Sequence, residues 1–154
     1  MKIYLDTSVV SAYFDIRTPD RQTSTKKLLD AALQSVSDEF YISDLVLTEL
    51  EQTPSTEKRQ KMLKLVENLP SLRPDEETLR LARVLHQAEL VPANKFDDAI
   101  HLALAAVIGV DVLVSWNFRH MVNLNVKRKL PVLLAQERYL RHFDIVSPYE
   151  YPEA

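Results

Sequence analysis

The sequence contains no cysteine. The chain therefore forms no disulfide, thiolate metal site or cysteine nucleophile, and any metal ion must be held by oxygen or imidazole ligands. No apolar run approaches the roughly 18 residues of a membrane span, and the first residues lack the long apolar stretch of a signal peptide. We therefore expect a cytoplasmic protein without a membrane segment.

Positive charge is not in excess either. The 154 residues carry a formal net charge of −3, and 46% are hydrophobic and 27% charged, as is typical of a globular protein. This balance argues mildly against broad electrostatic adhesion to nucleic acid. The segment 119–141 is locally basic, although such a cluster is more often a solvated helix face than a binding site. Because we find no repeat, low-complexity segment or linker, we expect residues 1–154 to form a single domain.

The apolar residues follow two kinds of spacing. Short apolar runs predict β-strands at residues 2–5, 40–42, 111–115 and 143–146. Apolar residues at helical spacing predict helices over residues 20–36, 44–50, 57–68, 75–90 and 96–109, and around Pro131. The alternation of strands and helices predicts an α/β fold, with three α/β/α layers around a central parallel sheet of four to five strands.

Several residues are suited to begin or end these helices. Thr7 or Ser8 can cap a short helix after the first strand, and Ser43 can cap the helix after the second. Gly109, the only glycine, is expected to end the helix before it. The two helices between residues 57 and 90 are expected to form a hairpin that covers the sheet.

Acidic residues stand where the apolar runs meet polar positions. Asp6 follows the first strand, Glu49 lies on the helix after the second, and Asp98 lies in the first turn of a later helix. The carboxyl ends of parallel strands meet at one edge of a sheet, so these carboxylates can converge there. Singly, Asp6, Asp44, Asp97 and Asp98 are explained as turn, capping or helix-dipole residues. Glu49 is harder to explain in this way, because the surrounding helix is strongly apolar and a buried carboxylate needs a partner.

Converging carboxylates repel one another unless a divalent cation neutralises them. Mg²⁺ suits such a site because it takes oxygen ligands and keeps several waters. An ion of this kind activates water and stabilises charge on a phosphoryl oxygen. The chemistry that these residues indicate is phosphodiester hydrolysis.

Four segments, in this order, resemble a known family. They are Ile-Tyr-Leu-Asp-Thr-Ser at 3–8, Tyr-Ile-Ser with Thr-Glu-Leu at 41–43 and 48–50, the apolar helix start at 98–105, and Ser-Trp-Asn-Phe-Arg-His at 115–120. Together they resemble the PIN domain family over almost the whole chain, and are similar to the VapC toxins of toxin–antitoxin pairs. The resemblance implies an endoribonuclease that depends on Mg²⁺ or Mn²⁺, acts on RNA, has a cognate antitoxin and forms a homodimer.

The resemblance also assigns roles to individual residues. By family position, the catalytic acids and metal ligands are Asp6, Glu49 and Asp98. Thr7 or Ser8 is expected to support Asp6 from beside it.

Two acidic positions leave alternatives. Asp97 is the rival to Asp98, and because neighbouring helix residues point about 100° apart, only one of them can face the site well. The family's fourth acid falls at Asn117 in this chain. A neutral amide oxygen there predicts a weaker hold on a second ion. Asp111 is not a substitute, because it starts the same strand and is expected at the opposite end.

The roles of the remaining candidates are open. His101 lies one helical turn after the predicted acid, where it can contact substrate, orient a carboxylate or be an ordinary buried histidine. Arg119 and His120 lie beside the predicted site and suit contact with the phosphates of a substrate. Trp116 and Phe118 suit core packing, with stacking on an RNA base as the alternative.

Two other functions compete with the nuclease. A nuclease-weak PIN-like module that binds RNA or a protein partner would account for Asn117 and the negative net charge. A phosphotransfer domain with Asp6 as the phospho-acceptor is the weaker alternative. A phosphatase of the haloacid-dehalogenase type would need a second Asp where this chain has Ser8.

Overall fold

The computed structural model describes residues 1–151 and is built around one parallel sheet. The strands are β1 (Lys2–Leu5), β2 (Glu39–Ser43), β3 (Ser71–Leu72), β4 (Val112–Val114) and β5 (Asp144–Val146). They lie in the order β3-β2-β1-β4-β5, and every neighbouring pair is parallel. The predicted parallel sheet of four to five strands is confirmed. No apolar run predicted β3, because it has only two residues.

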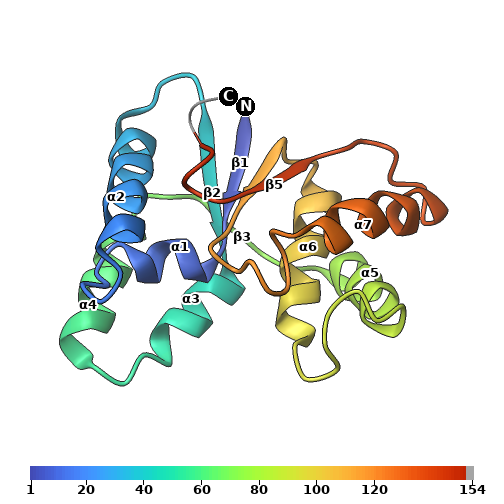
Figure 1. The fold of residues 1–154 in the computed structure, drawn as a ribbon, viewed down its shortest axis with the longest axis horizontal. Coiled ribbons are helices and arrows are strands. Elements are labelled where there is room, and N and C mark those ends of the chain that lie inside the picture. The colour runs from blue at the N-terminus through green and yellow to red at the C-terminus, as the bar shows by residue number, and fades with distance from the viewer. Residues whose placement is uncertain (152–154) are drawn as a thin grey trace.

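Helices cover both faces of the sheet. One layer contains α1 (Thr7–Ala12), α2 (Pro19–Gln34), α3 (Asp44–Glu51) and α4 (Thr56–Val66), and the other contains α5 (Glu76–Gln87), α6 (Phe96–Ile108) and α7 (Leu124–Gln136). Figure 1 shows the sheet between these two layers. The three-layer α/β/α architecture predicted from the alternation of strands and helices is confirmed.

The direction of strand addition reverses at β1. The strands β2 and β3 lie on one side of β1, and the chain then crosses to β4 and β5 on the other side. Residues 3–5 of β1 are completely buried, as expected for a central strand covered on both faces. Ligands of open α/β folds bind at the carboxyl ends of strands where such a reversal occurs. Asp6 directly follows β1 at this point.

The residues that cap the helices agree only in part with the predicted ones. Asp6 caps α1 by accepting a hydrogen bond from a backbone amide three residues further on, so the prediction of Thr7 or Ser8 as the cap is wrong. The reason is that α1 begins immediately after β1. Ser43 caps α3 and Gly109, with φ of 75°, ends α6, both as predicted.

The predicted hairpin of two helices between residues 57 and 90 is wrong. α4 packs against α1 and α3, whereas α5 packs against α6. Figure 1 shows α4 and α5 on opposite sides of the sheet. Between α4 and α5 the chain forms β3, which is an edge strand of the sheet. Helical spacing showed that each helix has an apolar face, but it did not show which face of the sheet that helix covers.

Within residues 1–151, no helix combines the length and the hydropathy needed to span a membrane.

Candidate functional site

Asp6 is buried at the carboxyl end of β1, with 3% of its surface exposed. The hydroxyls of Ser8 and Ser115 donate to its two carboxylate oxygens, each at 2.5 Å. Burial raises the pKa of the Asp6 carboxyl, and the positive charge of His101 and the two hydroxyl donors oppose that rise. The carboxylate therefore has a fixed orientation at the reversal point of the sheet.

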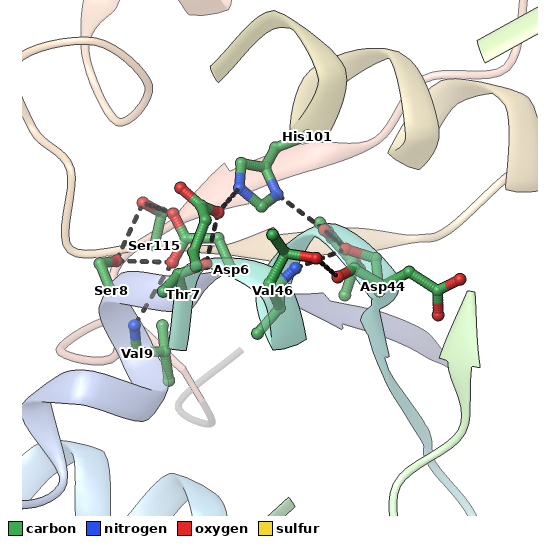
Figure 2. A network of polar contacts seen from close by, with 12 residues as sticks. Asp6, Thr7, Ser8, Val9, Asp44, Val46, His101 and Ser115 are labelled. Carbon is green, nitrogen blue, oxygen red and sulfur yellow. Dashed lines mark hydrogen bonds and ion pairs between the residues drawn. The ribbon is translucent and has the colours of Figure 1, made fainter. Parts of the chain in front are cut away.

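Ser115 is a member of the site that the sequence pattern did not single out. It follows β4, and its Oγ also accepts the backbone amide of Asn117 at 2.9 Å. The backbone amide of Trp116 donates to Ser8 Oγ at 2.9 Å. Figure 2 shows Ser8 and Ser115 beside Asp6. The sequence signal was available, since a hydroxyl residue ends an apolar strand at the edge that holds Asp6.

Glu49 lies on α3, and two side chains hold it. Thr7 Oγ1 donates to Glu49 Oε1 at 2.7 Å, and His101 Nε2 contacts the same oxygen at 2.9 Å. Burial disfavours the charged form of Glu49, but His101 and Thr7 outweigh it and lower the pKa of the carboxyl. Because this carboxylate is ionised, His101 Nε2 is the donor. Thr7 thus supports Glu49, and Ser8 supports Asp6.

A chain of buried hydrogen bonds fixes the ring of His101. The Tyr4 hydroxyl lies 2.7 Å from His101 Nδ1 and 2.8 Å from Ser43 Oγ. The other ring nitrogen contacts Glu49, and the whole residue is 2% exposed. Burial disfavours the charged imidazole, but the hydrogen bond to Glu49 and the surrounding carboxylates outweigh it and raise the pKa of His101. Both ring nitrogens are occupied, so His101 is placed to orient Glu49 rather than to contact a substrate. Figure 2 shows the His101 ring within this network.

Asp97 and Asp98 lie in the first turn of α6 and point in different directions. Asp98 Oδ2 contacts His120 Nδ1 at 3.1 Å, and the negative charge of Asp98 contributes to the raised pKa of His101. Asp97 is exposed. Of the two rivals, Asp98 is the one whose side chain contacts another residue of the predicted site, His120.

Asn117 stands where a fourth acid was expected, and its side chain serves the local turn. Its Oδ1 accepts the backbone amide of His120 at 2.9 Å. Asp111 precedes β4 at the opposite end of the strand, where it pairs with Arg141 at 2.5 Å and accepts from the Lys2 amide. As expected, Asp111 does not replace the missing carboxylate.

A groove of about 730 Å³ lies between the segment around residues 86–93 and the segment 119–126. Arg119 and His120 line one wall of it, and His86, at the end of α5, lies on another. His120 also contacts Asp98, so this side chain links the groove to one of the acids. Glu89 also lines the groove, so its walls carry one cation, one carboxylate and two imidazoles, which suit a polar ligand.

The chemistry of the acidic side chains fits a hard divalent cation. Within residues 1–151, Glu49 Oε2 and Asp98 Oδ1 have no hydrogen-bond partner, so both are available as ligands. Asp6 accepts three hydrogen bonds, and a carboxylate has about four lone-pair sites. No group of three His, Asp or Glu side chains in the described part of the chain lies close enough to hold a metal. A Mg²⁺ site would then use one or two carboxylates and several waters, which is its usual shell.

Comparison with known proteins relates this arrangement to a family. The family model described as PIN domain matches residues 3–120. A solved crystal structure, that of VapBC2 from Rickettsia felis bound to a DNA fragment from their promoter, contains a chain similar to this one with a TM-score of 0.57. The two chains are 17% identical, and the match covers 96% of this chain and 98% of the other. At this identity the likeness supports the fold alone. A search of curated proteins found no match.

Proposed function

The chain belongs to the PIN domain family, and from this premise we propose that it is a divalent-metal-dependent endoribonuclease and the toxin of a toxin–antitoxin pair. One observation carries the proposal. The carboxylates of Asp6, Glu49 and Asp98 come from three separate parts of the chain. The negative charge of each favours the protonated form of the buried His101 and raises its pKa. Such a concentration of negative charge at the reversal point of an α/β sheet is the expected form of a cation-dependent phosphodiesterase site.

Mg²⁺ or Mn²⁺ is the proposed cofactor, and Asp6, Glu49 and Asp98 are its proposed ligands, one or two of them directly and the remainder through bound waters. When bound, the ion would activate a water and stabilise the charge that develops on the phosphoryl oxygens. The hydroxyls of Ser8 and Ser115 hold Asp6 in place, and Thr7 and His101 hold Glu49. Preorganised ligands of this kind do not need to reorient during the reaction.

The groove lined by Arg119 and His120 is the proposed path of the RNA. Arg119 supplies a positive charge for a phosphate, and His120 contacts both the groove and Asp98. These assignments agree with the roles that the sequence predicted for Arg119 and His120.

The test is cleavage of a labelled single-stranded RNA in Mg²⁺ or Mn²⁺. Cleavage should stop in EDTA, and Asp98→Asn should reduce it by roughly 100-fold or more, because one charged group at the reaction centre is lost. Asp97→Asn is the matched control, since it removes the same charge from the same helical turn. Full activity of Asp98→Asn, or equal losses in both variants, would count against the assignment of Asp98.

A small antitoxin is the proposed protein partner. The similar Rickettsia felis structure is of VapBC2 bound to promoter DNA, and its matching chain shares the fold of this one. The expected observation is a short open reading frame beside the gene whose product co-purifies with this chain and blocks cleavage. A homodimer is likewise proposed, and sedimentation of the purified chain measures it. An isolated gene would weaken the antitoxin proposal, and a monomer at all concentrations would exclude the dimer.

One observation favours a second candidate function, a nuclease-weak module that binds RNA or protein. Asn117 replaces a carboxylate, and its amide oxygen is already used by the backbone of His120. In this case the purified chain would bind RNA in EDTA but show no cleavage in Mg²⁺ or Mn²⁺. Installing the missing charge with Asn117→Asp would then be expected to raise cleavage.

A further inference from the structure

An aromatic cluster lies on the loop that follows β4. The rings of Trp116 and Phe118 have centroids 6.1 Å apart, and Tyr149 packs edge-on against Trp116 at 4.6 Å. The guanidinium of Arg21, on α2, lies 5.3 Å from the centre of the Trp116 ring and 5.4 Å from that of Phe118. Three aromatic rings and one cation thus form a single cluster.

The members of this cluster differ in exposure. Trp116 is 5% exposed and belongs to the core, whereas Phe118 is 38% and Tyr149 48% exposed. Core packing, the predicted role of Trp116 and Phe118, therefore accounts for the first ring only. The exposed rings rest on the buried one, which leaves flat apolar surface open to solvent beside a positive charge.

Hydrogen bonds hold the cluster in place. Trp116 Nε1 donates to Thr25 Oγ1 at 2.8 Å, and Thr25 in turn donates to the backbone carbonyl of Arg21. The backbone carbonyl of Phe118 accepts from Asn123 Nδ2 at 3.1 Å. These bonds fix the buried ring against which the two exposed rings pack.

The cluster is joined to the acids through its own backbone. Trp116 follows Ser115, whose hydroxyl contacts Asp6, and the Trp116 amide donates to Ser8, which also contacts Asp6. Phe118 and Arg119 are neighbours in the chain, but Phe118 contacts the aromatic cluster while Arg119 lines the groove. The short loop 115–120 therefore contributes to the aromatic cluster and to the groove, and its first residue contacts Asp6.

We propose that Phe118 and Tyr149, with Arg21, form a base-stacking platform that binds an unpaired nucleotide of single-stranded RNA next to the acidic site. The platform rests on the proposed function for the identity of the nucleic acid. Aromatic faces and guanidinium planes bind the splayed bases of single strands, and the positive charge of the guanidinium is complementary to the phosphates. A purely apolar protein segment would make no use of the positive charge of Arg21 beside these rings.

Trp116 provides the readout, because it is the only tryptophan of the chain. The first probe is a short oligouridine, and the second is a ribose-phosphate chain of the same length without bases, both titrated in EDTA so that no cleavage takes place. Oligouridine should change the fluorescence of Trp116, and the abasic chain should not. Phe118→Leu, which keeps an apolar side chain but removes the ring, should weaken oligouridine binding by roughly 5- to 150-fold, the range for loss of one stacked base.

Tyr149→Leu should weaken oligouridine binding over the same range, and neither change should alter binding of the abasic chain, whose affinity is measured by calorimetry because it leaves the fluorescence unchanged. Phe118→Tyr keeps the ring and should bind as the unchanged protein does. Leu140→Ala is the control for loss of an exposed apolar side chain elsewhere, since Leu140 is 81% exposed in the segment after α7. Equal affinity for the two probes, or unchanged oligouridine binding by both leucine variants, would overturn the platform.

The platform and the nuclease can fail separately. If the protein cleaves no RNA but the leucine variants lose oligouridine binding, the proposed activity fails and the platform stands. If the protein cleaves RNA and the leucine variants bind oligouridine normally, the platform fails alone. Loss of antitoxin binding in these variants with oligouridine binding intact would make the cluster a protein contact, and would also overturn the proposal.

Discussion

Deleting the hydroxyl of Tyr4 probes the hydrogen-bond chain that orients Glu49. Tyr4 is completely buried, and Tyr4→Phe keeps its ring while removing the oxygen between His101 Nδ1 and Ser43 Oγ. Ser43 retains the backbone amide that it caps. The His101 nitrogen, in contrast, is left buried without a partner. We therefore expect a loss dominated by one unsatisfied polar atom, about 1–3 kcal/mol in the free energy of unfolding.

The measurement is thermal and urea unfolding at neutral pH in EDTA. For a chain of this length the expected loss lowers Tm by roughly 2–12 °C. The matched control is Tyr41→Phe on the neighbouring strand β2, because the Tyr41 hydroxyl contacts only the exposed Glu39. That control should change stability by no more than about 0.5 kcal/mol.

A double-mutant cycle isolates the contact between Tyr4 and His101. In a His101→Leu background the Tyr4 hydroxyl has no imidazole to lose, so Tyr4→Phe should cost less, with a coupling of roughly 0.5–3 kcal/mol. The reasoning is refuted if Tyr4→Phe and Tyr41→Phe unfold with the same free energy. Under the proposed function, Tyr4→Phe should also slow RNA cleavage by roughly tenfold or more, because the ring that orients Glu49 loses its anchor.

Three further predictions concern single side chains. Ser115→Ala removes the hydroxyl donor of a buried carboxylate oxygen, so RNA cleavage should fall by roughly tenfold or more; unchanged turnover would contradict this role. Gly109→Ala should lower the free energy of unfolding by about 1–2 kcal/mol because φ is +75°, whereas an unchanged urea midpoint would show that the backbone relaxes. Arg80 holds the pKa of Glu77 at about 2, below its ordinary 4.5, so Glu77 stabilises the fold above pH 4.5 and loses this effect as the pH falls toward 2. Glu77→Gln should therefore lower Tm at pH 7 and not near pH 2, with Glu76→Gln as the neutral control; a difference that is constant with pH would contradict the assignment.

Local signals were sufficient for much of the fold and part of the site. The apolar runs predicted four of the five strands, and single residues such as Ser43 and Gly109 predicted helix ends, because capping depends on atoms within a few residues. The positions of Asp6 and Asp98 at a strand end and a helix start were predicted for the same reason. The cap of α1 was missed because Asp6 serves two roles, as cap and as a buried carboxylate of the site.

Features that depend on contacts between distant segments were not predictable. Ser115 contacts Asp6 across a sequence separation of 109 residues; its place at the end of an apolar strand locates it at the right edge of the sheet, but does not show that its hydroxyl reaches Asp6. The placement of α4 and α5 on opposite faces depends on β3, a strand too short to produce a pattern.

Local patterns in the sequence were enough to predict an α/β chain with acids near strand ends and helix starts, because alternation and capping are properties of short segments. Three contacts became visible only in the folded chain: Asp98 rather than Asp97 contacts His120, Thr7 donates to Glu49 while Ser8 donates to Asp6, and His101 contacts Glu49. Each of these contacts depends on the direction in which a side chain points. A side chain's direction depends on the neighbours that the folded sheet brings to it, and those neighbours come from other parts of the chain.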